Sequence, residues 1–303
     1  MRFLVLGSIN LDLTFKVDHI VERGETESSS SLTVNAGGKG ANQAAALAKA
    51  GADVSFAGKL GPDGKWVLKT LSSFDADTSL SIVDEDTRTG EAIIQVDKGG
   101  ENCILLFAGG NKEFKEDEID SIISSFSPGD VIVMQNEINL LDHAFKKAYE
   151  RGLKIVFNPS PFVPSLLDLP LEKVSLFFVN EVEAKAMTGY PVDAKSDDDF
   201  VKMGKKLLEL YPDGEVVLTA GKKGAYHFFG SSYCYSPIVD YPVLDTTGAG
   251  DTFTGYFLKA RSSGLDPKTA LDISSIASGL AVSRPGAMGA MPFWSEVMEV
   301  FGK

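Results

Sequence analysis

The chain has 303 residues, of which 44% are hydrophobic and 23% charged, enough for one large α/β domain or two average domains. Its formal net charge of -13 repels phosphate backbones, so we expect no nucleic-acid partner. The apolar run at residues 3–6 is too short for a signal peptide or a membrane span, which predicts a cytoplasmic protein without a membrane partner.

The cysteines and histidines argue against a zinc site and against a nucleophile activated by a histidine. Cys103 and Cys234 lie far apart and form no C-x-x-C pair, so we interpret them as small buried hydrophobes. None of the three histidines, His19, His143 and His227, has metal-ligand spacing or a nucleophile beside it. We therefore expect neither a zinc site nor a histidine-based triad.

The first third of the chain mixes strands and one helix. Residues 3–6 read as a buried strand, and residues 41–50 as a helix entered from four residues that include three glycines and closed by Gly51. Residues 53–57 follow as a strand. Residues 91–96 and 102–107 predict a hairpin, because a polar, glycine-containing turn joins two β-like runs.

From residue 131 onward, short apolar runs alternate with helical stretches. This alternation predicts a mostly parallel central sheet with helices on both faces, within a single domain covering residues 1–303. The predicted strands are 131–134, 155–157, 176–179 and 216–219, and the predicted helices are 140–149, 181–187, 200–210, 250–261 and 267–282.

Two hydrophilic strand-like segments interrupt this pattern, at about residues 14–34 and 91–107. Neither has the pattern of a strand covered by helices, so we expect a small projecting sheet that serves as a lid, a dimer surface or both. Ala92 and Ile94 would form its apolar inner surface. A hairpin without function is the alternative.

The glycine-rich segment at residues 245–255 is the strongest local signal for chemistry. Gly248 and Gly250 precede a predicted helix, where the absence of a Cβ lets a ligand approach the backbone. Free amides there, Ala249 included, favour an anion such as phosphate. Asp251 would repel that anion, so its presence predicts a base that accepts the proton of an attacking hydroxyl. The alternative is a plain helix N-cap.

Two further motifs suit a polyhydroxylated ligand. Gly38 and its neighbouring glycines open a helix, Lys39 adds positive charge, and Asn42 offers both a donor and an acceptor. Asn10 and Asp12 follow the first strand and alternate onto one face. A structural loop and a solvent-exposed turn are the respective alternatives.

Polar residues also follow the predicted strands, where ligand sites of open α/β sheets collect. Glu137, Asn180 and Glu183 are suited to Mg²⁺, although a helix N-terminal charge is the commoner role. A loop with Thr219, Gly221 and Gly224 would contact a nucleotide or serve only as a hairpin turn.

Two familiar nucleotide motifs are missing from the sequence. No G-x-x-x-x-G-K-[ST] segment exists, and no G-x-G-x-x-G follows the first strand. These facts argue against a P-loop protein and a dinucleotide oxidoreductase.

The order of five segments carries a resemblance that no single segment does. GSINLD, GGKGANQ, NPSP, NEVEA and DTTGAGDTF occur in this order from residue 7 to residue 253. Over essentially its whole length the chain resembles the ribokinase-like (PfkB) carbohydrate kinases. The resemblance implies that Asp251 is the base, with Gly248, Ala249 and Gly250 as the anion hole. The sugar-binding positions that it implies are Asn10, Asp12, Gly38, Lys39, Asn42, Glu137 and Asp251.

The resemblance also implies cofactors. Asn180 and Glu183 match an N-x-x-E element that organises Mg²⁺ and phosphate through water, and Thr219, Gly221, Gly224 and Gly250 match the side that binds ATP. A monovalent cation, K⁺, would be held by Asp245 and Thr247 together with the carbonyls of Ala281, Arg284 and Gly286. Ala290 and Pro285 depart from the family pattern beside that cation site. A homodimer through the projecting sheet is a further implication.

The expected reaction is transfer of the γ-phosphoryl group of ATP to the primary hydroxyl of a furanose, with ribose favoured by the sugar-binding set. Two alternatives remain open. One is a kinase of the same family for fructose, a tagatose derivative or a nucleoside. The other is a non-catalytic sugar-binding regulator, against which the intact Asp251 argues.

Overall fold

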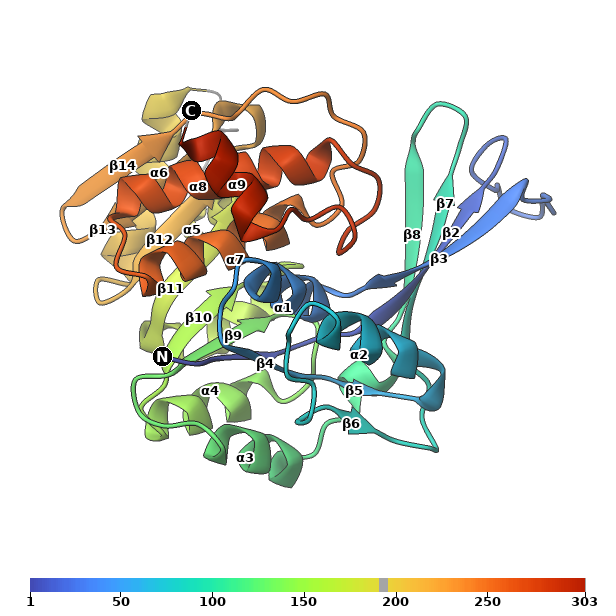
Figure 1. Ribbon diagram of the computed structural model, residues 1–303, viewed down its shortest axis with the longest axis horizontal. Coiled ribbons are helices and arrows are strands. Elements are labelled where there is room, and N and C mark those ends of the chain that lie inside the picture. The colour runs from blue at the N-terminus through green and yellow to red at the C-terminus, as the bar shows by residue number, and fades with distance from the viewer. Residues whose placement is uncertain (191–195, 303) are drawn as a thin grey trace.

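The computed structural model describes residues 1–190 and 196–302. Its centre is an eight-stranded sheet in the order β14-β13-β12-β11-β10-β9-β1-β4 (Figure 1). Six neighbouring strands of this sheet are parallel, namely β12, β11, β10, β9, β1 and β4. The other two, β13 and β14, are antiparallel at one edge. Their bounds are β1 Phe3–Leu6, β4 Val54–Ala57, β9 Val131–Gln135, β10 Lys154–Asn158, β11 Val174–Asn180, β12 Glu215–Thr219, β13 Ala225–Phe229 and β14 Ser232–Ser236.

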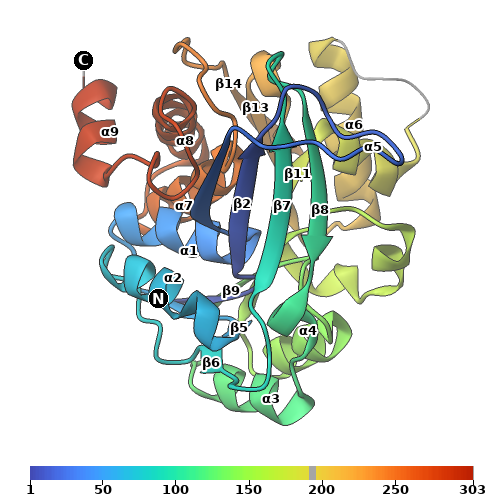
Figure 2. The same ribbon diagram turned by 90° about the vertical axis from the view of Figure 1, so that its right-hand side faces the viewer.

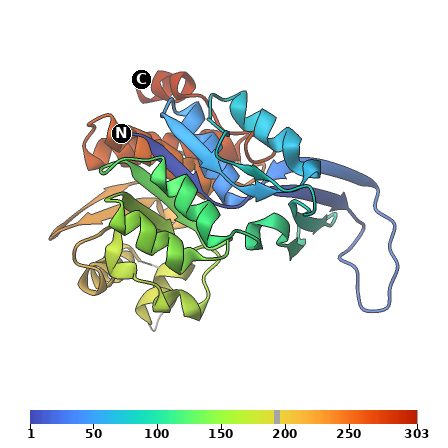
Figure 3. The same ribbon diagram turned by 90° about the horizontal axis from the view of Figure 1, so that it is seen from below.

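Helices cover both faces of this sheet, as the alternating pattern predicts (Figure 3). Strand β1 shows why, because Phe3 and Val5 belong to one buried cluster while Leu4 and Leu6 belong to the other. The first cluster includes residues of α1 Lys39–Lys49, α2 Lys65–Ser72, α7 Ala249–Ser262, α8 Pro267–Val282 and α9 Trp294–Phe301. The second includes residues of α3 Glu116–Ser124, α4 Leu141–Glu150, α5 Glu181–Thr188 and α6 Asp197–Leu210.

Helix α1 begins at Lys39, two residues before the predicted start at residue 41. The early start of this helix depends on the glycine at position 40. A Cβ on Gly40 would lie 2.5 Å from the backbone nitrogen of Ser8, so only a glycine lets this helix rest against the turn after β1. Among the described residues, no helix is both long and apolar enough to cross a bilayer.

A second sheet projects from the main body in the order β3-β2-β7-β8 (Figure 2). Its strands are β2 Asn10–Lys16, β3 Ser31–Gly37, β7 Gly90–Val96 and β8 Asn102–Phe107. The segment predicted at 14–34 is therefore two strands with a loop at 17–30 between them, and the strands extend to Asn10 and Gly37. Strand β2 follows β1 after only three residues, which places the motif with Asn10 and Asp12 inside this projecting sheet. A short pair, β5 Lys59–Leu60 and β6 Ile82–Val83, completes the sheets described.

The predicted burial of both cysteines is wrong. Cys103 is exposed and Cys234 is only partly buried. Cys103 lies on β8, an edge strand of the projecting sheet whose residues are all exposed. A cysteine there has no layer of helices to cover it, unlike one in the central sheet.

Candidate active site

Two cavities meet at the N terminus of α7. The larger has a volume of about 530 Å³ and the smaller about 240 Å³. Four residues line both cavities: Thr219, Thr246, Ala249 and Gly250. Two of the three residues of the predicted anion hole, Ala249 and Gly250, therefore lie where the two cavities meet.

Asp251 lies in the first turn of α7 and lines the smaller cavity. Its Oδ2 accepts a hydrogen bond from Asn42 Nδ2 at 3.2 Å, and its Oδ1 accepts one from Gln43 Nε2 at 2.9 Å. Both donors come from α1, so two helices far apart in sequence fix the carboxylate. Gly248 precedes the helix with φ 74°, a left-handed conformation that suits glycine. No side-chain cap is formed at this helix end, which removes the N-cap alternative for Asp251.

The electrostatics around Asp251 suit a base. Burial raises the pKa of this carboxyl, and the neighbouring Lys39 and the two amide donors counteract part of the rise. Burial by itself would lower the pKa of Lys39, but the carboxylates of Asp251, Glu137 and Glu183 bring it above its ordinary value. Lys39 therefore stays protonated among these three acids.

Glu137 connects the start of α1 to the end of β9. One of its oxygens, Oε2, accepts hydrogen bonds from the Lys39 backbone nitrogen at 3.0 Å and from the Ser8 hydroxyl. The Ser8 hydroxyl also accepts from the Gly40 backbone nitrogen at 3.3 Å. Gly38, with φ 90°, passes so close to Ser8 that a Cβ would lie 2.9 Å from its carbonyl oxygen.

Asp12 lies on β2 and points to the same face as Asn10, as their alternation predicts. Gly37 pairs with Asn10 on β3, and a Cβ there would overlap the Asp12 carboxylate at 2.2 Å. Burial, and then repulsion by Glu137, raise the pKa of Asp12 to about 7. Ala92 of β7 pairs with Asp12 and is buried. Ile94, two residues further along β7 on the same face, is partly buried.

Asn180 and Glu183 both line the smaller cavity. They form a capping box at the start of α5, in which Asn180 Oδ1 accepts from the Glu183 backbone nitrogen at 2.9 Å and Glu183 Oε2 accepts from the Asn180 backbone nitrogen at 3.0 Å. Asn180 and Glu183 therefore have the common structural role of capping a helix N terminus, and they also line the cavity. Glu183 is buried, and the Asn180 backbone nitrogen holds one of its carboxylate oxygens in place.

The loop after β12 forms one wall of the larger cavity. Thr219, Gly221 and Gly224 line it, and the loop also reverses the chain into the antiparallel strand β13. The turn is therefore real, and contact of this loop with a nucleotide stays a prediction. The wall also has an apolar part. Phe253 in it belongs to the DTTGAGDTF segment, whereas Ile238, Tyr241, Val243 and Val282 lie in no motif of the sequence analysis.

The segment predicted to bind a monovalent cation comes together with the chain beyond α8. Asp245 Oδ1 accepts from the Thr247 backbone nitrogen and Oδ2 from the Gly286 backbone nitrogen, both at 2.9 Å. Burial alone would raise the pKa of Asp245, but these hydrogen bonds lower it. The Ala281 carbonyl accepts from the Arg284 backbone nitrogen at 3.0 Å and keeps a second lone pair. Asp245 and Thr247 themselves line neither cavity.

Three residues of the site were not singled out from the sequence. Gln43 bridges Asp251 and Asn158 Oδ1, the latter at 3.3 Å, and Asn111 Nδ2 donates to Asn10 Oδ1 at 2.8 Å. Gln43 and Asn158 were present in the GGKGANQ and NPSP segments, which was the available signal. Asn111 lies in no such segment.

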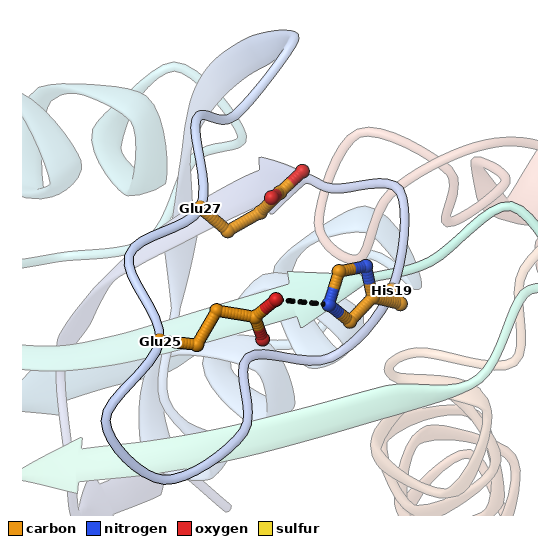
Figure 4. A group of neighbouring side chains, drawn as sticks. All are labelled: His19, Glu25 and Glu27. Atoms are coloured by element: carbon orange, nitrogen blue, oxygen red, sulfur yellow. Dashed lines mark hydrogen bonds and ion pairs between the residues drawn. The ribbon is translucent and has the colours of Figure 1, made fainter.

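All three histidines lie beside carboxylates, and His19 belongs to a group of three possible metal ligands that the spacing in the sequence did not indicate. His19 Nε2 lies 2.8 Å from Glu25 Oε1, with Glu27 nearby (Figure 4). The hydrogen bond to Glu25 raises the pKa of His19. This group is on the 17–30 loop and lines neither cavity, so it takes no part in the site at α7.

The N terminus of α7, the buried carboxylate of Asp251 and the two adjoining cavities are features that the class of small-molecule kinases requires. The comparison with known families agrees with this class. Residues 2–294 match the model described as pfkB family carbohydrate kinase, and the chain belongs to that family.

Curated and solved relatives cover nearly the whole chain. The ribokinase of Staphylococcus aureus (strain COL) is 32% identical over 312 residues, covering 99% of both chains. The ribokinase of Cryptococcus neoformans var. grubii serotype A in complex with ADP is 35% identical with a TM-score of 0.87, covering 99% of both chains. The Arabidopsis thaliana ribokinase complexed with ribose and ATP is 27% identical with a TM-score of 0.88, covering 100% of this chain and 99% of that one.

Proposed function

We propose that this chain transfers the γ-phosphoryl group of ATP to the primary hydroxyl of D-ribose, giving ribose 5-phosphate and ADP. The observation that carries this proposal is the position of Asp251, which is buried, hydrogen-bonded to Asn42 and Gln43, and lines the smaller cavity next to the residues shared with the larger one. A pure sugar-binding protein needs no buried carboxylate at a phosphate-binding helix end.

Asp251 acts as the base in this mechanism. The sugar hydroxyl lies between Asp251 and the phosphate, transfers its proton to the carboxylate and attacks the γ-phosphorus as the bond to ADP breaks. Asn42 has a second function, because its Oδ1 is buried without a hydrogen-bond partner among the described residues. This oxygen accepts from a sugar hydroxyl, which removes the cost of leaving it unpaired.

The amides at the start of α7 stabilise the transferring phosphoryl group. The first N–H groups of a helix have no partner within the helix. The Ala249 N–H donates to the Thr246 carbonyl at 3.2 Å, contrary to the expectation that it is free, so the proposed donors are the N–H groups of Gly248 and Gly250, which both line the smaller cavity. Lys39 lines the smaller cavity and adds a positive charge. Because these donors are fixed before the reaction, they stabilise developing charge without reorganisation.

Two cations fit the residues present. Glu183 and Asn180 would hold Mg²⁺ through water, since hard oxygen ligands with retained water are what this ion prefers. When bound, Mg²⁺ supplies charge neutralisation on the ATP phosphates. Asp245, kept ionised by its two amide donors, would hold K⁺ with the carbonyls of Ala281, Arg284 and Gly286. The absence of a hydroxyl at Ala290 leaves K⁺ with one protein ligand fewer than the family pattern supplies.

The projecting sheet supports two further parts of the proposal. One face carries Asn10 and Asp12 and covers the sugar, which excludes water and suppresses ATP hydrolysis. On the opposite face, Leu105 and Phe107 of β8 are 66% and 48% exposed. An apolar face of this kind on a projecting sheet fits a second copy of the chain, so we propose a homodimer through this sheet. A cytoplasmic location is part of the proposal because that compartment supplies ATP.

The test is an ADP-release assay with ATP, Mg²⁺ and K⁺ across a panel of sugars and nucleosides. We expect the highest kcat/KM with ribose and a product identified as ribose 5-phosphate by mass spectrometry. Stronger turnover of fructose, a tagatose derivative or a nucleoside would reject ribose and keep the kinase mechanism. Sugar binding by calorimetry without any turnover would reject the mechanism as well.

A further inference from the structure

Asn10 and Asn111 lie together at the base of the projecting sheet. Asn111 belongs to the short helix Gly109–Lys112 that follows β8, and both side chains are buried. Gly90, the first residue of β7, pairs with Asn10 across the sheet. A Cβ on Gly90 would lie 2.3 Å from both Asn10 Oδ1 and Asn111 Nδ2, so the two amide side chains fill the space beside the first residue of β7.

The orientation of the Asn111 amide is fixed by the backbone of one residue. The Ile9 backbone nitrogen donates to Asn111 Oδ1 at 3.0 Å, and Asn111 Nδ2 donates to the Ile9 carbonyl at 3.3 Å. A backbone N–H can only donate and a carbonyl can only accept. A flipped Asn111 would therefore lose both hydrogen bonds.

This fixed amide determines in turn which way Asn10 faces. Asn111 Nδ2 donates to Asn10 Oδ1 at 2.8 Å, so the oxygen of Asn10 is engaged and its NH₂ group is the one left for a ligand. We infer that Asn111 is a positioning residue, which orients Asn10 to donate a hydrogen bond to the sugar. This inference rests on the proposed function, in which Asn10 binds the sugar.

The chemistry of a hydroxyl explains why this orientation matters. Asp12 is two residues along the same strand and on the same face, and its carboxylate can only accept when ionised. A sugar hydroxyl has one proton to give and lone pairs to receive. Asn10 as donor and Asp12 as acceptor satisfy both needs, whereas a flipped Asn10 would present a second acceptor to a single proton.

The experiment is a double-mutant cycle on the full chain. Asn111→Leu has nearly the same shape and no polar atoms, and Asn10→Ala removes the group that Asn111 orients. We expect Asn111→Leu to raise the KM for ribose about tenfold, with the KM for ATP unchanged, because one hydrogen bond to the sugar is lost. In the Asn10→Ala background the same change should add no further increase. Asn111→Asp, which keeps an acceptor for the Ile9 backbone nitrogen and lacks the amide donor to Asn10, is the second variant if the leucine variant does not fold; it is assayed at pH 9 to favour the ionised carboxylate.

The outcomes separate this inference from the function it rests on. An equal rise in KM with and without Asn10 means that Asn111 acts only on the fold, and it overturns the inference. An unchanged KM for ribose in the Asn111 variants overturns it as well. A wild-type chain that does not phosphorylate ribose at all instead rejects the proposed function.

Discussion

Asn42 donates a hydrogen bond from Nδ2 to Asp251 Oδ2 at 3.2 Å, although 209 positions separate the two residues in the chain. The contact joins α1 to the first turn of α7. Gln43 makes the parallel contact to the other carboxylate oxygen. In the proposed mechanism the base is therefore oriented by the helix that also carries Lys39 and Asn42, two of the residues proposed to bind the sugar.

Asp251→Asn tests the base. An amide cannot accept the proton of the sugar hydroxyl, so we expect kcat to fall by at least ~10² while ribose still binds. ADP release gives kcat, and calorimetry gives ribose affinity. Asp142→Asn is the matched control, because Asp142 is an exposed acid in the first turn of α4. Near-normal turnover by Asp251→Asn would remove the base assignment.

The sugar affinity should depend on pH through Asp12. Its pKa is raised to about 7, so the carboxylate is ionised above that pH and protonated below it. An ionised carboxylate accepts stronger hydrogen bonds, so the KM for ribose should rise as the pH falls from 8 to 6. Glu137→Gln removes a repelling charge and should move the midpoint to lower pH. A KM that varies in the same way in Asp12→Asn would assign the pH dependence to another group.

Gly250→Ala should separate stability from activity. A Cβ at Gly250 meets nothing within 4 Å, yet Gly250 lines both cavities. Replacing a helical glycine should therefore increase the free energy of unfolding by about 0.4–1 kcal/mol, while the methyl group crowds the phosphate and lowers kcat. Urea denaturation and ADP release measure the two effects. Gly289→Ala, also in open space but lining neither cavity, is the control. Unchanged kcat in Gly250→Ala would contradict the placement of the phosphate.

Leu105→Glu should weaken the proposed dimer. Leu13, Ile93 and Leu105 face each other across three strands, on the side of the sheet opposite Asp12. A charge in that row would have to be buried on dimerisation, which is costly. Light scattering over a concentration series should show a larger monomer fraction than in the wild type. Leu210→Glu, at the end of α6, should leave the mass unchanged. A wild type that is monomeric throughout would reject the dimer.

Asp245→Asn should change the response to K⁺. The carboxylate is the only charged group proposed to hold this ion, so its loss should raise the K⁺ concentration needed for half-maximal activity by about tenfold. Tetramethylammonium chloride keeps the ionic strength constant in the titration. A thermal-shift titration with K⁺ gives a second readout without substrate. If both titrations match the wild type, Asp245 does not bind the cation.

The sequence by itself was sufficient for the fold class, and it singled out several residues that the structure places around the two cavities. Alternating apolar runs and helical stretches predict a covered parallel sheet because burial on both faces follows from local periodicity. Glycines before a predicted helix, as at Gly248 and Gly250, indicate an anion site because their backbone requirement is also local. Strand ends predict where Asn180 and Glu183 gather, since parallel strands end at one edge.

Only the tertiary structure decided how these parts work together. The contacts of Gln43 with Asp251 and of Asn111 with Asn10 join residues 208 and 101 positions apart, so no local pattern could reveal them. The raised pKa of Asp12 arises from burial and from Glu137, which the fold brings near. The exposure of Cys103 and the start of the projecting sheet at Asn10 could not be predicted for the same reason. Both depend on which strands the fold leaves without a covering layer of helices. Motifs and local periodicity can be read from the order of the residues. The orientation, burial and pKa of a side chain depend instead on neighbours that only the folded chain brings close.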